Sequence, residues 1–208
     1  MTTAEQTATL QTPAMPSEKI WPTRFAHAVF KTSRYRVMVD WYLNLLNAHV
    51  VFGSESLTFM TYDDEHHRIA IINMPGLQDQ SPLTSGLEHI SYTYGSLGDL
   101  LANYERLNLA GVVPYWCINH GPTTSLYYRD PDGNQVETQF DNFNSVKELH
   151  DFFHSDAFAA NPIGVDFSPT LLLELYRAGT PVSELSKRGA APVPGQQAGT
   201  PSIPPALR

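Results

Sequence analysis

The sequence predicts an α+β fold in which a unit of strand, helix and three strands occurs twice. Runs rich in β-forming residues alternate with stretches whose apolar residues recur at helical spacing. In the first half these runs are RFAHAVFK, then the helical RYRVMVDWYLNLLN, then HVVF, SLTFMTYD and HRIAIINM. After the connection GLQDQSPLTSG, the order recurs as LEHISYTY, the helical SLGDLLANYERLNLAG, VVPYWCIN, TSLYYRD and NQVETQFD.

The two halves also match residue by residue. A shift of 62 positions superimposes five identical pairs: His27 on His89, Tyr42 on Tyr104, Ala48 on Ala110, Val50 on Val112 and Val51 on Val113. A repeated unit of this kind usually cannot bury its hydrophobic face alone, so the two copies should pack into one core. We therefore expect a single domain over residues 21–142, with modules at 21–76 and 85–142.

The segments that flank this domain differ from it in composition. Residues 1–20 are dominated by Thr, Ala, Gln and Pro, which bury too little apolar surface to offset their ordering entropy, so a disordered N-terminal tail is expected. Residues 143–180 contain two helical patterns, SVKELHDFFHSDAF and SPTLLLELYRAG. Residues 181–208 form a Pro/Gly-rich tail, part of which can lie over the domain.

Composition argues against several classes of partner. The net charge of -8 and the pI near 5.4 argue against binding to nucleic acid or to an anionic membrane surface. The sequence has no apolar run of about 18 residues and no signal-peptide pattern, so neither a membrane span nor secretion is expected. The single cysteine, Cys117, cannot form an internal disulfide, which fits a reducing compartment. We therefore expect a cytoplasmic protein.

Two histidines and one glutamate are the candidate metal ligands. Side chains alternate between the faces of a strand, so both His27 in FAHAVF and Glu137 in NQVETQF can face the interior. The duplication places His27 and His89 at equivalent positions, close to the axis that would relate the modules. A carboxylate beside two imidazoles on one buried face is costly without a cation. Two imidazoles and one carboxylate suit a non-haem Fe(II) centre with open positions.

Four segments carry a resemblance to a known family: FAHAVF, GLEHISY, DEHHRIAII and NHGPTTSLYYRDPDGNQVETQFD. They resemble the vicinal oxygen chelate superfamily, and within it most closely the type I extradiol catechol dioxygenases. The resemblance implies an open, cupped sheet of eight strands built from paired βαβββ modules. It also implies that His27, His89 and Glu137 hold Fe(II), with Mn(II) as the alternative. A catechol-type aromatic diol and dioxygen would be the reactants.

The position that supplies a fourth ligand in glyoxalase-type relatives holds no ligand here. In those relatives this ligand comes from the last strand of the first module. The shift of 62 positions leads from Glu137 to Pro75, and the neighbouring IINM offers neither a carboxylate nor an imidazole. The sequence therefore argues against a glyoxalase.

The last hairpin decides which tyrosine faces the site. Residues 130–133 fit a type I turn with Pro second and Gly in the left-handed position, followed by a bulge. That loop pairs Asp130 with Asn134 and places Tyr127 opposite Glu137. A tight two-residue loop would instead bring Tyr128 to that face, so the prediction of Tyr127 depends on the bulge.

The resemblance also implies substrate contacts. In the resembled family, a tyrosine ten residues before the glutamate and a histidine further upstream contact the substrate hydroxyls, which here are Tyr127 and His120. The alternative for His120 is a loop histidine that caps the end of a strand. A further catalytic histidine of the two-domain relatives has no obvious counterpart, since His66 and His67 look like the start of a strand. His150 and His154 have a metal-clamping spacing but no third ligand, so they are expected at the surface.

Oxidative cleavage of a catechol ring, in aromatic compound catabolism, is the function that these observations favour. A second interpretation keeps the fold and a metal but changes the reaction to that of an isomerase, epimerase, lyase or thiol transferase. A third is a metal-free resistance protein that binds an aromatic drug. A single module pair suggests that a second subunit or the C-terminal helices complete the pocket, so a homo-oligomer is also expected.

Overall fold

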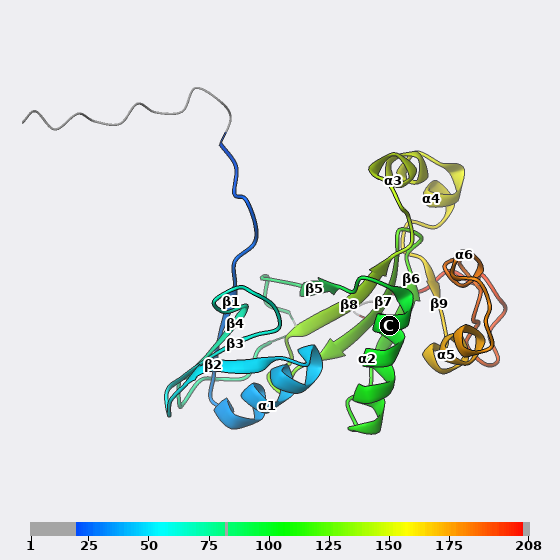
Figure 1. Ribbon diagram of the computed structural model, residues 1–208. Helices are drawn as coiled ribbons and strands as arrows, with labels where there is room; N and C mark the ends of the chain where they lie inside the picture. Colours follow the sequence, from blue (N-terminus) through cyan, green and yellow to red (C-terminus); the bar gives the residue numbers. More distant parts are fainter. Residues whose placement is uncertain (1–19, 82, 206–208) are drawn as a thin grey trace, which may run out of the picture.

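Each half of the chain forms its own β-sheet (Figure 1). The computed structural model describes residues 20–81 and 83–205, so nearly all of the predicted N-terminal tail lies outside the described residues. The first sheet has the order β1-β4-β3-β2, with β1 Ala28–Thr32, β2 His49–Gly53, β3 Leu57–Thr61 and β4 Ile69–Asn73. The second has the order β5-β8-β7-β6-β9, with β5 His89–Thr93, β6 Trp116–Asn119, β7 Thr123–Arg129, β8 Gln135–Asp141 and β9 Val165–Asp166.

Both halves have the predicted βαβββ order. In each sheet the first strand of the module pairs in parallel with its last strand, and the remaining pairs are antiparallel. The predicted α+β fold with paired modules is therefore confirmed. The strands lie in two separate sheets rather than one, and the sequence analysis did not foresee the short strand β9, which adds to the edge of β6.

The two module helices, α1 Tyr35–Leu46 and α2 Leu97–Leu109, form because their apolar residues share one face. Met38, Tyr42 and Leu45 of α1 are fully buried and follow each other at helical spacing. In α2 the side chain of Ser96 caps the helix by accepting a hydrogen bond from the Asp99 amide at 3.0 Å. α1 packs on β4 and α2 on β8, so each helix covers the sheet of its own module.

The spacing between the modules changes along the chain. Ala28 pairs with Ile69 in the first sheet, and Ile90 pairs with Val136 in the second. The first strands are therefore 62 positions apart, whereas the last strands are 67 apart. The counterpart of Glu137 is thus Ala70, and the expectation of Pro75 was wrong, because the second module is longer between α2 and β8. Alanine offers no ligand atom either, so the argument against a fourth ligand is unchanged.

Two polar contacts, one buried and one exposed, tie the modules together. The Tyr42 hydroxyl of α1 donates to Asp130 Oδ2 of the β7–β8 hairpin at 3.1 Å. Arg34, just before α1, donates to Asp132 of the same hairpin at 2.8 Å. Asp130 is only 5% exposed, so its carboxylate depends on Tyr42 and on donors within the hairpin, chiefly Asn134, rather than on water. The position of the hairpin is therefore coupled to α1.

The C-terminal segment adds helices to the second sheet. They are α3 Val146–Phe153, α4 Asp156–Ala160, α5 Pro169–Arg177 and α6 Val182–Leu185. Figure 1 shows α3 and α4 projecting away from the sheets and α5 and α6 beside β9. Residues of the predicted Pro/Gly-rich tail lie against the domain, with Leu185 and Ala191 buried. The proposed division of the chain at residues 142 and 180 stays a prediction.

None of the helices in the described part of the chain has the length and apolar character needed to cross a bilayer.

Replacing Tyr42 with phenylalanine should lower the free energy of unfolding by about 1.5–3 kcal/mol, because Asp130 then loses a buried donor. Urea denaturation would measure it. The matched control is Tyr104→Phe at the equivalent position of α2, whose hydroxyl meets the partly exposed Thr170 hydroxyl at 3.0 Å. Its loss should be only about 0.5–1.5 kcal/mol. Equal losses in both variants would contradict the coupling between α1 and the hairpin.

Candidate metal centre and catalytic residues

His89 and Glu137 meet on one face of the second sheet. His89 begins β5 and Glu137 lies within β8, where it pairs with Ser91 of β5. The parallel register brings His89 Nε2 to 3.2 Å from Glu137 Oε2. Glu137 is 4% exposed, whereas the His89 side chain is 35% exposed. The structure therefore places two of the three predicted ligands together, with the imidazole open to one side.

The surroundings of Glu137 keep its carboxylate ionised. Burial raises the pKa of this group, but hydrogen bonds from His89, Ser125, Ser91 and Tyr127 outweigh burial and lower the pKa to about 2. The same hydrogen bond to Glu137 raises the pKa of His89 against the opposing effect of burial. A buried carboxylate compensated by an imidazole is a donor set that a divalent cation can use once the imidazole is neutral. These residues therefore fit a metal.

His27 lies in a different group of side chains. It directly precedes β1 rather than lying within the predicted strand, and its ring stacks on His67 at a centroid distance of 4.2 Å and lies 6.0 Å from His66. Ligand nitrogens of these three histidines lie within 4.8 Å of one another. Within residues 20–81 and 83–205, this is the one group of three metal-ligating residues that the structure brings together at that spacing. The structure does not bring His27 into such a group with His89 and Glu137.

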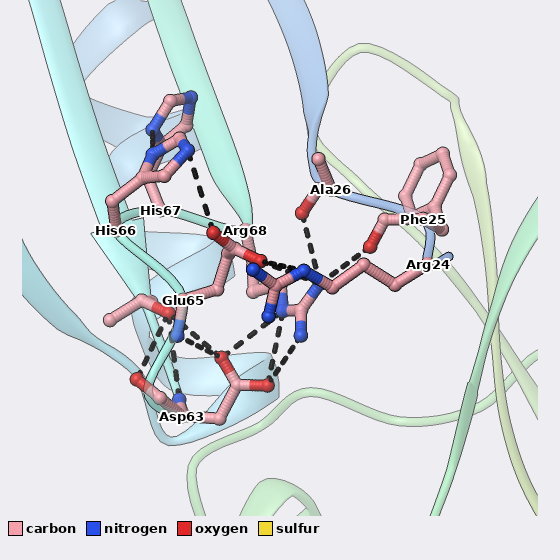
Figure 2. Close-up of polar contacts among 9 residues, drawn as sticks. Arg24, Phe25, Ala26, Asp63, Glu65, His66, His67 and Arg68 are labelled. Carbon is pink, nitrogen blue, oxygen red and sulfur yellow. Dashed lines mark hydrogen bonds and ion pairs between the residues drawn. The ribbon is translucent and has the colours of Figure 1, made fainter. Parts of the chain in front are cut away.

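A network of charged side chains holds this histidine cluster in place (Figure 2). Arg68 donates to the carbonyl oxygens of Phe25 and Ala26 at 2.6 and 3.0 Å, and so anchors the two residues before His27 to the turn before β4. Asp63 holds the Arg68 guanidinium through both carboxylate oxygens. This anchoring explains why a residue from the edge of β1 lies beside the turn between β3 and β4.

That turn, residues 62–68, also carries His66 and His67, so neither histidine lies in a strand, contrary to the expectation. The nearly buried Glu65 contacts His66 Nε2 at 3.5 Å and is held by Arg24 at 3.0 Å (Figure 2). The closeness of this pair to His27 cannot be read from the sequence, because it depends on two segments about 40 residues apart.

His120 and Tyr127 join the cluster around Glu137. His120 follows β6, and its Nε2 lies 3.0 Å from the Tyr127 hydroxyl. Its Nδ1 lies 2.5 Å from the carbonyl oxygen of Ile163, which can only accept a hydrogen bond. We therefore assign the ring proton to Nδ1, which leaves the lone pair of Nε2 facing Tyr127. The alternative of a histidine that caps a strand end does not describe these ring contacts.

The register of the last hairpin is as predicted. Gly133 has a φ of 89°, and the Asp130 amide donates to Asn134 at 3.0 Å. Tyr127 consequently pairs with Glu137, while Tyr128 points into the core and is 1% exposed. Burial, together with the negative charge of Glu137, raises the pKa of Tyr127, so its hydroxyl keeps its proton.

Aromatic rings surround the Tyr127 side chain. The Trp116 ring stacks on it at 4.8 Å, and the His89 ring meets it edge-on at 5.4 Å. The Tyr127 hydroxyl lies between two acceptors, His120 Nε2 and the Glu137 carboxylate. Because the hydroxyl has one proton, it can donate to only one of them at a time. His150 and His154, by contrast, stack on each other at the exposed surface of α3, as expected.

Comparison with known proteins identifies the family. Residues 24–138 match the family model described as the Glyoxalase/Bleomycin resistance protein/Dioxygenase superfamily. The chain belongs to that superfamily. The resemblance given by the first strands and the last hairpin is thereby confirmed. The superfamily match contains all of the predicted ligands and both predicted substrate-contacting residues.

Two relatives of the chain are named as dioxygenases of Rhodococcus globerulus. Biphenyl-2,3-diol 1,2-dioxygenase 2 is 46% identical over 164 residues, which cover 78% of this chain and 86% of the relative. Biphenyl-2,3-diol 1,2-dioxygenase 3 is 45% identical over 170 residues, which cover 81% and 90%. Among solved structures, a glyoxylase/bleomycin resistance protein/dioxygenase domain from Frankia sp. EAN1pec is 20% identical with a TM-score of 0.49, covering 58% of this chain and 99% of that one.

His120 should stay neutral at pH values where an exposed histidine is protonated. Burial is the main cause that lowers its pKa below the usual 6.5. The corresponding contribution to stability is present above pH 6.5 and is lost as the pH falls through the lower pKa of the folded state. An NMR titration of ring-labelled protein, assigned with a His120→Gln variant, would measure the midpoint. A midpoint at or above 6.5 would contradict a neutral, half-buried ring.

Proposed function

We propose that this protein is a non-haem Fe(II) extradiol dioxygenase that opens the aromatic ring of a catechol-type diol with dioxygen. The observation that carries the proposal is the pairing of His89 Nε2 with the buried, ionised Glu137 at 3.2 Å. This donor pair lies within a superfamily match, in a chain 45–46% identical to two proteins named as dioxygenases of a biphenyl diol. The chain carries a tyrosine and a neutral histidine beside the same carboxylate.

His27, His89 and Glu137 would hold the metal, with Fe(II) as the proposed ion and Mn(II) as the alternative. Two imidazoles and a carboxylate would leave positions at which a catechol and dioxygen are held side by side. His89 must give up its proton to become a ligand, so metal binding and proton release are coupled at this residue. Since His27 stacks on His67, its membership of the triad is the part of the proposal that an experiment must address first.

Tyr127 and His120 would bind and orient the substrate hydroxyls. The Tyr127 hydroxyl keeps its proton and can donate to a negatively charged catecholate oxygen. His120 Nε2 carries a lone pair and can accept a proton from a substrate hydroxyl. The Trp116 ring, stacked on Tyr127, gives that side of the site an aromatic wall. The homo-oligomer and the cytoplasmic location expected from the sequence stay predictions.

We also propose that His66 or His67 supplies the further histidine that the resembled family uses as an acid or base. Both rings lie beside His27. If the metal binds at His27, one of these rings would have to reach the bound substrate in order to move a proton without binding the metal itself.

Substitutions at the ligands should separate metal binding from proton transfer. The single variants His27→Gln, His89→Gln and Glu137→Gln should each lose most bound iron after anaerobic loading with Fe(II). The double variant His66→Gln/His67→Gln should keep the iron but lose roughly 100-fold or more in kcat. Iron would be quantified by elemental analysis, and ring cleavage by oxygen uptake and the yellow ring-opened product from 2,3-dihydroxybiphenyl and catechol.

The control is His150→Gln, an exposed histidine on α3, which should match the unsubstituted protein in both measurements. Loss of iron in the His66/His67 double variant, with iron retained in Glu137→Gln, would instead place the metal in the histidine cluster. An iron-loaded protein that consumes no oxygen with any catechol would favour another metal-dependent reaction. Binding of aromatic compounds without any metal would favour the resistance-protein interpretation.

A further inference from the structure

The short loop that carries His120 is enclosed by the C-terminal segment, which lies outside the residues matched by the family model. The Arg188 guanidinium, just after α6, donates to the main-chain oxygen of His120 and, at 2.9 Å, to that of Asn161. The same guanidinium lies over the Phe152 ring of α3 at 5.1 Å. One side chain thus links the His120 loop to two separate parts of the C-terminal segment.

A tight turn at residues 161–164, which we call the 161–164 turn, supplies the acceptor for the His120 ring. Ile163 within it accepts the hydrogen bond from His120 Nδ1 at 2.5 Å. The Asn161 side chain closes the turn by bonding both the amide and the carbonyl of Gly164 at 2.8 Å. The Ile163 carbonyl is therefore held in a fixed direction.

The backbones of the turn and of the His120 loop approach each other closely. Gly164 has a φ of 127°, and a Cβ at this position would overlap the Asn119 carbonyl and lie 2.9 Å from His120 Cα. On the other side of the loop, a Cβ at Gly121 would overlap the Phe152 ring. Only glycine permits this packing, so the loop is clamped from both sides.

The Arg188 guanidinium binds main-chain oxygens around His120 rather than a carboxylate. Among the described residues, the structure gives Arg188 no carboxylate partner, and its buried Nε has no hydrogen-bond partner. Burial lowers the pKa of the guanidinium, because removing its charge from water costs free energy that an exposed arginine does not lose. Its positive charge also disfavours a second proton on His120. An arginine can bridge two carbonyls and lie on a ring at once, which a lysine cannot do equally well.

We propose that Arg188 is a positioning residue, and that it and the 161–164 turn hold the His120 ring with its proton on Nδ1 and its Nε2 lone pair beside Tyr127. The orientation itself follows from the geometry of this chain. Its effect on catalysis rests on the proposed function, because only a reacting substrate would need that lone pair. In this proposal the C-terminal segment orients a residue of the site, in addition to packing on the sheet.

The first test reads the His120 ring directly and needs no activity. Nitrogen-15 NMR of ring-labelled histidine distinguishes Nδ1–H from Nε2–H in the full chain, and the His120→Gln spectrum assigns the signals. We expect Nδ1–H in the unsubstituted protein and a mixture of the two tautomers in Arg188→Gln, with Arg188→Lys between them. The matched control is Arg177→Gln, an arginine of α5 that instead pairs with the partly exposed Glu105 at 2.7 Å. This control should keep Nδ1–H.

The second test measures ring cleavage by iron-loaded protein. Arg188→Gln should lower kcat roughly 10- to 100-fold at unchanged iron content and with little change in KM. Arg188→Lys should recover part of that loss, and Arg177→Gln should lose less than twofold. If Arg188→Gln does not fold, Asn161→Ala opens the 161–164 turn while keeping the guanidinium, and it should give the same mixture of tautomers.

Nε2–H in the unsubstituted protein would overturn the inference. So would an Arg188→Gln protein whose tautomer and kcat match those of Arg177→Gln. If the unsubstituted protein shows Nδ1–H and Arg188→Gln shows the mixture, but neither cleaves a catechol, the positioning role stands and the proposed function fails. Ring cleavage that is unchanged in Arg188→Gln and in Asn161→Ala would support the proposed function and overturn the positioning role.

Discussion

The negative charge of Glu137 is almost wholly removed from water, and side chains of the neighbouring strands donate hydrogen bonds to it. Two serine hydroxyls, a tyrosine hydroxyl and an imidazole compensate the charge from β5 and β7. These donors can meet only because the parallel β5–β8 register sets His89 and Ser91 beside the carboxylate. A buried carboxylate with fixed donors and one exposed imidazole favours a cation at that imidazole. Both the metal proposal and the assignment of Tyr127 depend on this arrangement.

The two modules have the same fold but different side chains at equivalent positions of their last strands. Where the second module has Glu137, the first has Ala70, which is buried and offers no donor. In the first module His27 instead lies beside His66 and His67 of the turn before β4. Duplication therefore explains the paired sheets and the equivalent histidines, while divergence of the last strands explains why one module holds the carboxylate. A site of this kind is asymmetric although its scaffold is repeated.

Two of the residues that contact His120 come from outside the repeated scaffold. The family match ends at residue 138, whereas Ile163 and Arg188, which contact His120, follow it. Strand β9 brings this segment to the end of β6, and α5 packs against α2. The common fold thus places Glu137 beside His89, and the added segment contributes the Ile163 carbonyl and the Arg188 guanidinium that contact His120.

The sequence by itself determined the two modules, their βαβββ order, the place of His89 at the first strand and of Glu137 in the last strand of the second module, and the hairpin that turns Tyr127 toward Glu137. Each follows from local periodicity, from turn chemistry or from the repeat, which are properties of neighbouring residues. Only the tertiary structure decided that His27 stacks on His67, that Ala70 rather than Pro75 corresponds to Glu137, and that a main-chain carbonyl fixes the His120 ring. These depend on register and on backbone atoms of distant segments, and a carbonyl oxygen is the same in every residue type.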